Sequence, residues 1–394
     1  MPRPSKASVA AELTARVFGA GPTGALAALA LARSGWRVEV WDPLPRAALL
    51  ERSRAYALTH SSAVLLEQLQ LWEGLQGVCT PFRRLELCDR ALEQQVTFAA
   101  SDLPSRSGRA NSDAVGWILE HRPLMEQLLV ALAQQPSLQV HLGCDPSAAG
   151  PLAPVALELA ADGPGSPQRR AARIRHCRRP YRQGCLTVQV GLRGSASDQA
   201  WELFRPEGPF AVLPLGGEAF QLVWSAPLPR LQQLEQLEPL AFLDALSAAL
   251  PAQLQPEVLL DQPTAFPVAL ELAWPLRRGR LLLLGEAAHR SHPVGGQGLN
   301  LCWRDVATLH TLAAQVAHGR LSPAQLPRRY AQRRWLDIVL VLLATDALVR
   351  LFSNRLTLLL PLRRLALGWL ARWRWLRRLS LAAMTDGPCE LHWR

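Results

Sequence analysis

The cysteines of this chain form no pattern that could cross-link a small fold through disulfides. They are seven in number, widely spaced and without a Cys-x-x-Cys pair: Cys79, Cys88, Cys144, Cys177, Cys185, Cys302 and Cys389. An odd, scattered set argues against a disulfide framework and against a cysteine-ligated metal site. His289 and His292 have no third ligand nearby, so we expect no metal site there either. The cysteines favour a reducing compartment, and we expect a cytoplasmic protein.

Long apolar runs are also missing. A membrane-spanning helix needs about 18 or more consecutive apolar residues. The candidate runs near the C-terminus, 338–344 and 356–362, are much shorter than this and are bordered by arginine or aspartate. Residues 1–15 are polar and mixed with alanine, without the apolar core of a secretion signal. We therefore expect neither a spanning helix nor secretion.

Acidic residues are the minority, and the imbalance is concentrated near the C-terminus. The chain has 43 basic and 32 acidic residues, a formal charge of +11. After residue 320 there are 13 arginines and 4 acids, which gives +9 of that total. Such a segment can bind nucleic acid or an anionic membrane surface. With 394 residues, 49% of them hydrophobic, the chain is long enough for two structural regions and an appendage.

The most informative stretch runs from Arg16 to Asp42. A short strand leads into Gly19-Ala20-Gly21-Pro22-Thr23-Gly24, which has the G-x-G-x-x-G spacing, and a helix of small residues follows. The first glycine permits the sharp turn, the second lets the backbone approach a pyrophosphate, and the third lets the helix lie close to the strand. The next strand ends in Asp42, 18 positions beyond Gly24, where a carboxylate can bind an adenosine ribose. The unit predicts a bound dinucleotide, and the motif alone does not distinguish NAD from FAD.

Further strands are predicted along the chain from hydrophobic alternation or short apolar runs. They lie in 82–98, 116–120, 138–142, 155–159, 185–192, 200–204, 210–215, 220–225 and 281–284. The two strands within 82–98 belong to a separate sheet, and those between 185 and 225 predict an antiparallel sheet. Helices are expected from near Ser61, from Pro123 and over 229–250.

Two further motifs follow predicted strands. Asp162-Gly163 can place a carboxylate at the carboxyl edge of a sheet, where ligands bind, or can simply form a turn. Between Gly285 and Asn300 four glycines indicate close backbone approach to something flat or phosphorylated, ahead of a helix that carries Asp305.

Taken in order, these motifs resemble those of the flavoprotein aromatic hydroxylases of the p-hydroxybenzoate hydroxylase fold. Within that group the chain resembles the ubiquinone-biosynthesis hydroxylases. The resemblance covers nearly the whole chain. The resemblance implies an α/β fold with a discontinuous Rossmann-like FAD-binding domain, an antiparallel β-sheet substrate domain and a C-terminal helical segment. No second G-x-G-x-x-G follows Gly24, which suits enzymes that meet NAD(P)H only transiently. No catalytic triad or carboxylate pair is evident, as expected where a cofactor carries the chemistry, and we predict no catalytic side chain.

The resemblance also implies which residues contact FAD. They are Gly19, Gly21, Gly24, Asp42, Arg54, Arg122, Asp162, Gly163, Gly285, Glu286, Pro293, Gly296, Gln297, Gly298, Leu299 and Asn300. Arg54 matches an arginine near the flavin, and the segment from Glu286 to Asn300 matches the family motif around the ribityl chain and the isoalloxazine ring. This chain departs from the family in two places. Glu286 stands where the family usually has aspartate, and 144–161 is short, which could loosen the FAD domain.

The implied function is hydroxylation of an aromatic ring, a prenylated phenol on the way to a quinone, with FAD, NAD(P)H and dioxygen. Two alternatives stay open: an FAD-dependent isoprenoid reductase or cyclase, and a non-catalytic flavoprotein in a quinone-synthesis complex. We expect a small apolar aromatic substrate, no nucleic acid, and possible quinone-biosynthesis partners.

We divide the chain into segments of three kinds. FAD-binding segments are 1–80, 116–178 and 273–326, substrate segments are 81–115 and 179–272, and a helical segment is 327–394. In the last, tryptophans stand among arginines on short apolar stretches: Trp369, Trp373 and Trp375. This composition is typical of a segment lying on an anionic bilayer, here peripherally on the inner membrane, and a packed helical cap is the alternative.

Overall fold

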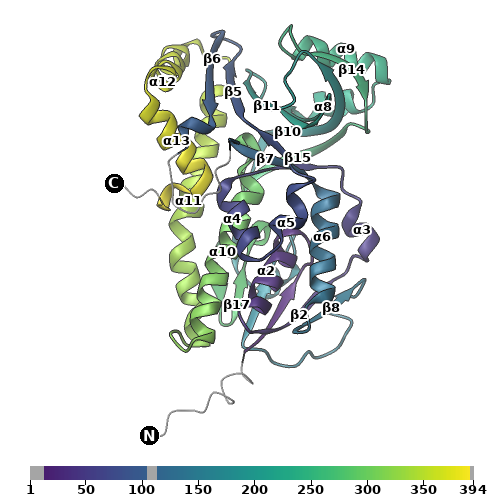
Figure 1. Ribbon diagram of the computed structural model, residues 1–394, viewed down its shortest axis with the longest axis vertical. Coiled ribbons are helices and arrows are strands. Elements are labelled where there is room, and N and C mark those ends of the chain that lie inside the picture. Colours follow the sequence, from purple (N-terminus) through teal and green to yellow (C-terminus); the bar gives the residue numbers. More distant parts are fainter. Residues whose placement is uncertain (1–12, 104–112, 391–394) are drawn as a thin grey trace, which may run out of the picture.

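The structure is a computed structural model that describes residues 13–103 and 113–390 (Figure 1). Three β-sheets and a set of C-terminal helices organise it. The expectation of a missing secretion signal concerns mainly residues 1–12, which lie outside the described residues, as do 104–112 and 391–394. The division of the chain into domains stays a prediction.

The first sheet, here called the parallel sheet, has six strands in the order β16-β17-β9-β1-β2-β8. They are β1 (Thr14–Phe18), β2 (Arg37–Asp42), β8 (Leu138–Leu142), β9 (Leu157–Ala160), β16 (Arg277–Arg278) and β17 (Leu281–Leu283). All neighbours run parallel except the edge pair β16 and β17. Strand β17 is entirely leucine and buried, as expected for a strand covered on both faces. The strands predicted around 16–18, 36–42 and 281–284 all lie here.

Three helices pack beside the parallel sheet: α2 (Pro22–Arg33), α6 (His121–Gln134) and α10 (Gln297–Ala317). Helix α2 begins with proline, whose fixed φ suits a first turn, and consists mainly of buried alanine and leucine. It ends ahead of Gly35, whose φ of +86° is the left-handed conformation that stops a helix. Helix α6 begins at His121, two residues before the predicted start at Pro123, because proline is also tolerated within the first turn.

The second sheet, here called the large sheet, has nine strands. They are β5 (Arg84–Asp89), β6 (Gln94–Ala99), β10 (Arg175–Arg193), β11 (Gln199–Phe204), β12 (Phe210–Gly216), β13 (Ala219–Pro227), β14 (Gln255–Leu259), β15 (Thr264–Trp274) and β18 (His289–Arg290). Helices α8 (Leu228–Glu235) and α9 (Pro239–Ala249) contact it. The sheet was predicted to be antiparallel, but β5 and β11 run parallel. The two strands come from distant parts of the chain, so no hairpin imposes an antiparallel direction.

The third sheet, here called the small sheet, has the order β3-β7-β4. Its strands are β3 (Ala55–Leu58), β4 (Thr80–Phe82) and β7 (Gly116–Glu120). Its strand β7 lies between the other two sheets in Figure 1. The short helices of this part of the chain are α3 (Arg46–Leu50), which contacts α6, and α4 (His60–Gln68) and α5 (Trp72–Gln76), which contact each other. Short 3-10 turns complete the fold: η1 (Ala100–Asp102), η2 (Gly285–Ala287), η3 (Val294–Gly296), η4 (Pro323–Gln325), η5 (Thr357–Leu359) and η6 (Pro388–Glu390).

The C-terminal segment is helical, as predicted. Helix α11 (Leu326–Phe352) runs along one side of the molecule, and α12 (Leu360–Arg372) and α13 (Arg374–Asp386) lie beside β6 and η1 (Figure 1). Among the described residues, no helix is both long and apolar enough to cross a bilayer.

One arginine of this segment is not at the surface. Arg363 directly follows the apolar run 356–362, and its side chain is only 1% exposed. Its Nε donates to the Leu351 carbonyl at 2.7 Å, and its Nη1 lies 3.8 Å from Asp89 at the end of β5. A buried guanidinium needs such acceptors, so Arg363 stabilises the packing of α12 on the fold.

Candidate active site

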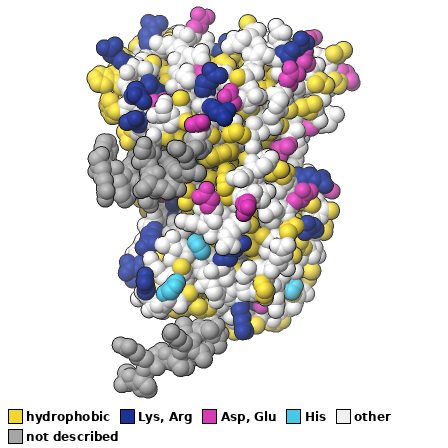
Figure 2. Space-filling view, viewed as in Figure 1, with side chains coloured by type: hydrophobic (Ala, Val, Ile, Leu, Met, Phe, Trp, Pro, Cys, Tyr) yellow, Lys and Arg dark blue, Asp and Glu magenta, His cyan; other side chains and the backbone are white. Residues whose placement is uncertain are grey.

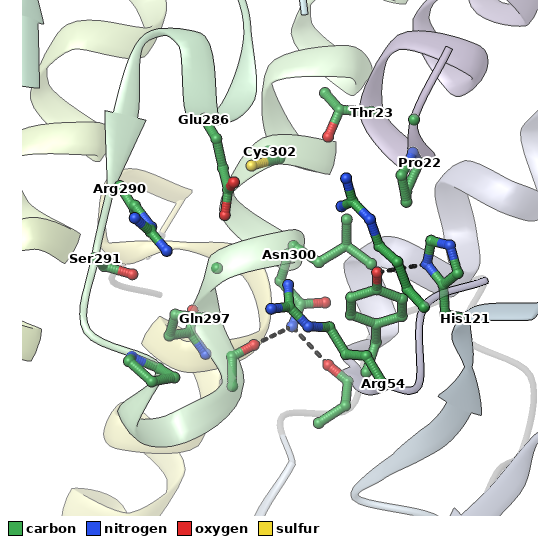
Figure 3. Close-up of a pocket in the computed structure, with 18 of the residues that line it drawn as sticks. Pro22, Thr23, Arg54, His121, Glu286, Arg290, Ser291, Gln297, Asn300 and Cys302 are labelled. Carbon is green, nitrogen blue, oxygen red and sulfur yellow. Dashed lines mark hydrogen bonds between the residues drawn. The ribbon is translucent and has the colours of Figure 1, made fainter. Parts of the chain in front are cut away.

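A cavity of about 630 Å³ lies where the three sheets meet (Figure 3). Ligand sites commonly have volumes of about 300–1,000 Å³. All the residues for which the resemblance implies an FAD contact line this cavity, except Gly24, Gly285 and Arg122. The fold therefore brings together segments that are far apart in the sequence.

The glycines between β1 and α2 have three different surroundings. A Cβ on Gly19, whose φ is +102°, would lie 2.4 Å from the Ala161 carbonyl oxygen. A Cβ on Gly24 would lie 1.9 Å from the Gly19 carbonyl oxygen, whereas one on Gly21 would meet no atom within 4 Å. The fold itself thus requires Gly19 and Gly24. Gly21 instead leaves open space at the N-terminus of α2, where a phosphate is stabilised.

Asp42, at the end of β2, holds this turn in place. Its Oδ2 accepts a hydrogen bond from the Ala20 N–H at 2.6 Å, and its Oδ1 accepts one from the Leu44 N–H at 2.8 Å. Its side chain nevertheless lines the cavity. Because each carboxylate oxygen can accept more than one hydrogen bond, Asp42 can hold the turn and still bind a ribose hydroxyl.

Tyr56 of β3 and His121 of α6 form a hydrogen-bonded pair close to Arg54, whose carbonyl accepts from the His121 N–H at 2.7 Å. His121 Nε2 lies 2.8 Å from the Leu49 carbonyl, which can only accept, so Nε2 carries the proton. Nδ1 then accepts from the Tyr56 hydroxyl at 2.8 Å. Burial lowers the pKa of His121 and raises the pKa of Tyr56, so both are neutral at pH 7. Arg54 lies above the Phe266 ring, with its guanidinium carbon 5.5 Å from the ring centroid.

Asp162 and Gly163 follow β9 at the carboxyl edge of the parallel sheet, and both line the cavity. Asp162 Oδ2 accepts from the Gln168 N–H at 3.2 Å, while its Oδ1 is buried and has no partner among the described residues. Burial raises the pKa of Asp162. Gly163 has a φ of +84°, so the motif is both a turn and part of the cavity wall. An unpartnered acceptor here fits a ligand that donates a hydrogen bond.

Asn300 fastens the glycine-rich loop to the small sheet. Its Nδ2 donates to the Ala57 carbonyl at 2.7 Å and to the Gly296 carbonyl at 2.8 Å. Its Oδ1 accepts from the Thr59 N–H at 3.0 Å and from the Ser62 hydroxyl at 2.7 Å. The amide is therefore fully engaged in positioning the loop, whose Gly296 has a φ of +62°.

Glu286 lines the cavity, and its side chain is exposed (Figure 3). It makes no ion pair within residues 13–103 and 113–390. Residues 143–156 contain no strand, and Asp145, Pro146 and Ser147 from this stretch line the cavity directly. A weakening of FAD binding by Glu286 and by the short stretch stays a prediction.

Arg122 lies elsewhere. It stands in the first turn of α6, is 68% exposed and pairs with Glu126 at 3.0 Å. It does not line the cavity. The structure therefore offers no support for an FAD contact at this position.

The side of the cavity formed by the large sheet is mainly apolar and includes Leu85, Leu87, Leu213 and Val223. Four polar side chains of this sheet also line the cavity: Thr187, Glu202, Gln221 and Arg290. Sequence reasoning missed Glu202. The sequence does contain a signal for it: Glu202 is the single acid in the predicted strand 200–204, whose other residues are apolar or aromatic.

The chain is similar to known flavoproteins in sequence and in fold. Residues 158–337 match a family model described as an FAD binding domain. The chain is 30% identical to ubiquinone hydroxylase UbiL of Rhodospirillum rubrum, with 93% of this chain and 87% of the relative covered. It is 29% identical to 3-demethoxyubiquinol 3-hydroxylase of Escherichia coli, with 89% and 93% covered. Among solved structures, p-nitrophenol 4-monooxygenase PnpA of Pseudomonas putida has a TM-score of 0.75 at 16% identity, covering 95% of this chain and 98% of that one.

The family model and the relatives define an FAD-dependent oxidoreductase. Within that class, the chain belongs to the family of the ubiquinone-biosynthesis hydroxylases, which are flavoprotein monooxygenases acting on aromatic rings. The expected fold class, FAD cofactor and monooxygenase activity are confirmed. The individual FAD contacts remain predictions.

Proposed function

We propose that this enzyme hydroxylates the ring of a prenylated phenol on the way to a quinone. The continuity of the cavity carries the proposal. One cavity joins Gly21, at the dinucleotide turn, to Leu85 and Leu213 on the large sheet. A nucleotide at one end therefore faces an apolar wall at the other. The ubiquinone hydroxylases that the chain resembles support the substrate class.

The residues present fit FAD. Gly21 leaves space for a pyrophosphate, and Asp42 has acceptor capacity for a ribose. The unpartnered Oδ1 of Asp162 can accept from one of the hydroxyl groups of the cofactor. When bound, FAD supplies the redox chemistry, taking a hydride from NAD(P)H and activating dioxygen.

The chain's own part is to orient the ring and exclude water. Leu381 and Met384 of α13 also line the cavity. Leu381 packs in the same apolar cluster as Leu85 and Leu213 of the large sheet. Apolar walls offer few hydrogen-bond partners to water. They bind an apolar ring and prenyl chain because burying apolar surface stabilises the complex by about 25 cal/mol per Å². This wall favours a phenol that carries an apolar chain over a charged aromatic acid.

Turnover of the FAD-loaded enzyme tests the proposal. A farnesylated phenol should stimulate NAD(P)H oxidation, and label from ¹⁸O₂ should enter the product. Phenol without the chain serves as the control and should stimulate far less. NAD(P)H oxidation without label in the product would favour the reductase or cyclase. FAD binding with no substrate-stimulated oxidation would favour the non-catalytic member of a quinone-synthesis complex.

We also infer that α12 and α13 rest on an anionic membrane surface. The inferred contact surface, here called the interfacial surface, comprises exposed apolar residues and arginines: Leu358, Leu362, Leu365, Trp369, Trp373, Trp375, Arg355, Arg364, Arg372 and Arg374. Figure 2 shows hydrophobic and basic side chains side by side over α12. Tryptophan and arginine on short helices are typical of interfacial segments. Because α13 also lines the cavity, docking would place a bilayer-dissolved substrate near the site.

A further inference from the structure

Glu202 is a buried carboxylate in the apolar wall of the cavity. It lies in β11, opposite Leu87 of β5 and Ala211 of β12, and all three line the cavity. Side chains of directly opposed strand residues project from the same face of a sheet. Glu202 is only 7% exposed, so its charge has little access to bulk water.

Glu202 has unused hydrogen-bonding capacity. Within residues 13–103 and 113–390 it makes one hydrogen bond, in which Oε2 accepts from the Gly295 N–H at 3.3 Å. The other buried carboxylate nearby, Glu86 of β5, differs. It projects from the opposite face and accepts from the Gln95 amide and the Thr97 hydroxyl, both at 2.7 Å. A buried acid left with one weak partner at a cavity wall is costly, and a ligand that donates a hydrogen bond would relieve that cost.

Gly295 places Glu202 beside the expected site of reaction. The glycine belongs to the loop that is predicted to hold the flavin ring, and it also lines the cavity. Glu202 stands on the large sheet and is bonded to this loop. It therefore lies where the apolar wall meets the side of the cavity expected to hold the cofactor.

We propose that Glu202 is a catalytic residue that accepts the proton of the substrate's phenolic hydroxyl. In this step the O–H bond breaks, the proton moves to a carboxylate oxygen, and the electron pair stays on the phenolic oxygen, from which it activates the ring toward electrophilic oxygen. The proton returns to the phenolic oxygen of the product, which regenerates the carboxylate. The substrate identity rests on the proposed function, whereas the recognition of a hydroxyl at Glu202 does not.

The protonation behaviour of Glu202 suits this role. Burial raises its pKa to about 7, while the Gly295 N–H favours the charged form. A general base works best when its pKa lies near the working pH. Buried Cys185 interacts electrostatically with Glu202 but does not line the cavity. None of the other titratable groups on the cavity walls forms a hydrogen bond or ion pair with Glu202 among the described residues; these groups are Asp42, Arg52, Arg54, Tyr56, His121, Asp145, Asp162, Glu286, Arg290 and Cys302.

His292 lies close to the same loop, in edge-to-face contact with Tyr181, which donates to Asp346. Burial lowers the pKa of His292 to about 4 and raises that of Tyr181. Both are therefore neutral near pH 7. Neither group of this pair therefore accounts for a titration in that range.

Turnover of Glu202→Gln in the holoenzyme is the first test. The amide has the same size but is not a base, so kcat for the farnesylated phenol should fall about 10²-fold or more, the range for general bases. In the wild type kcat should rise with pH through about 7, because the base must be deprotonated, and this limb should be absent in the variant. Glu86→Gln is the matched control and should keep both kcat and the limb.

Binding to the oxidised holoenzyme is the second test, and it needs no turnover. The farnesylated phenol should bind at least tenfold more tightly than its methyl ether, because only the phenol donates a hydrogen bond. Glu202→Leu should remove this preference while keeping FAD. An unchanged preference in Glu202→Leu, or wild-type kcat with the pH limb retained in Glu202→Gln, would overturn the assignment. Failure of wild-type hydroxylation with the preference intact would count against the proposed function alone.

Discussion

Arg334 Nε of α11 lies 2.6 Å from Asp305 Oδ1 of α10, and both side chains are buried. The same carboxylate accepts from the Gly285 N–H at 3.0 Å, and its Oδ2 lies 2.7 Å from His289 Nε2. Asp305 therefore connects the C-terminal helix to the segment predicted to hold the flavin. Burial alone would raise the pKa of Asp305, but His289 and Arg334 hold it at about 2.

Replacing Asp305 by asparagine should destabilise the fold strongly. The change removes one of the two carboxylates that pair with the buried Arg334 guanidinium and leaves only Asp337, at 2.7 Å. Breaking a buried ion pair in this way costs about 3–5 kcal/mol. Because the folded-state pKa is depressed, the stabilisation is present above the ordinary pKa of 3.8 and is lost as pH falls toward 2. Denaturant unfolding of the wild type and of Asp305→Asn, at pH 7 and at low pH, measures both effects.

The exposed pair Arg122–Glu126 provides the control for that prediction. Its side chains are 68% and 47% exposed, so water screens the interaction. Glu126→Gln should change the free energy of unfolding by no more than about 0.5 kcal/mol. If Asp305→Asn costs no more than this control, the buried network does not stabilise the fold.

Gly21→Val should give a folded protein that holds no FAD. A side chain at this position meets no protein atom within 4 Å, so it projects into the space left for the pyrophosphate. Flavin absorbance of the purified protein and circular dichroism measure the two properties separately. Gly77→Val is the matched control, since Gly77 has a φ of −71° and equally open surroundings away from the cavity. A yellow Gly21→Val protein would contradict the assignment of the turn.

The local units of the fold could be predicted from the sequence. The strand, glycine turn and helix around Gly21 depend on neighbouring residues, and so does the stop at Gly35. The parallel pairing of β5 with β11 could not be predicted, because distant segments set it and no turn constrains it.

The burial of individual polar residues was equally inaccessible. Arg363 has the same sequence surroundings as its exposed neighbour Arg364, and only the packing of α12 next to Asp89 distinguishes them. Glu202 was missed for the same reason. From the sequence alone, an acid within a strand is expected to face solvent, and only the structure shows that Glu202 faces a cavity.

Glu286→Asp should keep or tighten FAD binding, and Glu286→Ala should weaken it. The reason is that aspartate restores the side-chain length usual in the family, whereas alanine removes the acceptor. Glu286 is exposed, so neither change should disturb folding. Titration of the FAD-free protein with FAD, followed by flavin fluorescence, measures the affinity. Equal affinity of Glu286→Ala and the wild type would remove Glu286 from the set of predicted contacts.

The interfacial surface should bind anionic vesicles, and polar substitutions there should release it. Leu358, Trp369 and Trp373 are 87%, 58% and 48% exposed, so a triple change to glutamine removes membrane-binding area without opening a core. Deleting the tail would be a poorer test, because Leu381 and Met384 line the cavity. Sedimentation with phosphatidylserine vesicles measures binding, and flavin absorbance verifies that the site is intact.

The dependence of binding on charge and on the position of the changed residues distinguishes this contact from nonspecific membrane binding. Each arginine near an anionic surface contributes about 1 kcal/mol at low ionic strength, so Arg364→Gln with Arg372→Gln should weaken binding, and salt should weaken it further. Leu240 and Val258, which are 78% and 50% exposed on α9 and β14, provide the control. Their change to glutamine should leave pelleting unchanged. If that pair lowers pelleting as much as the tail changes do, or if the tail variants pellet like the wild type, α12 and α13 form a packed cap rather than a membrane contact.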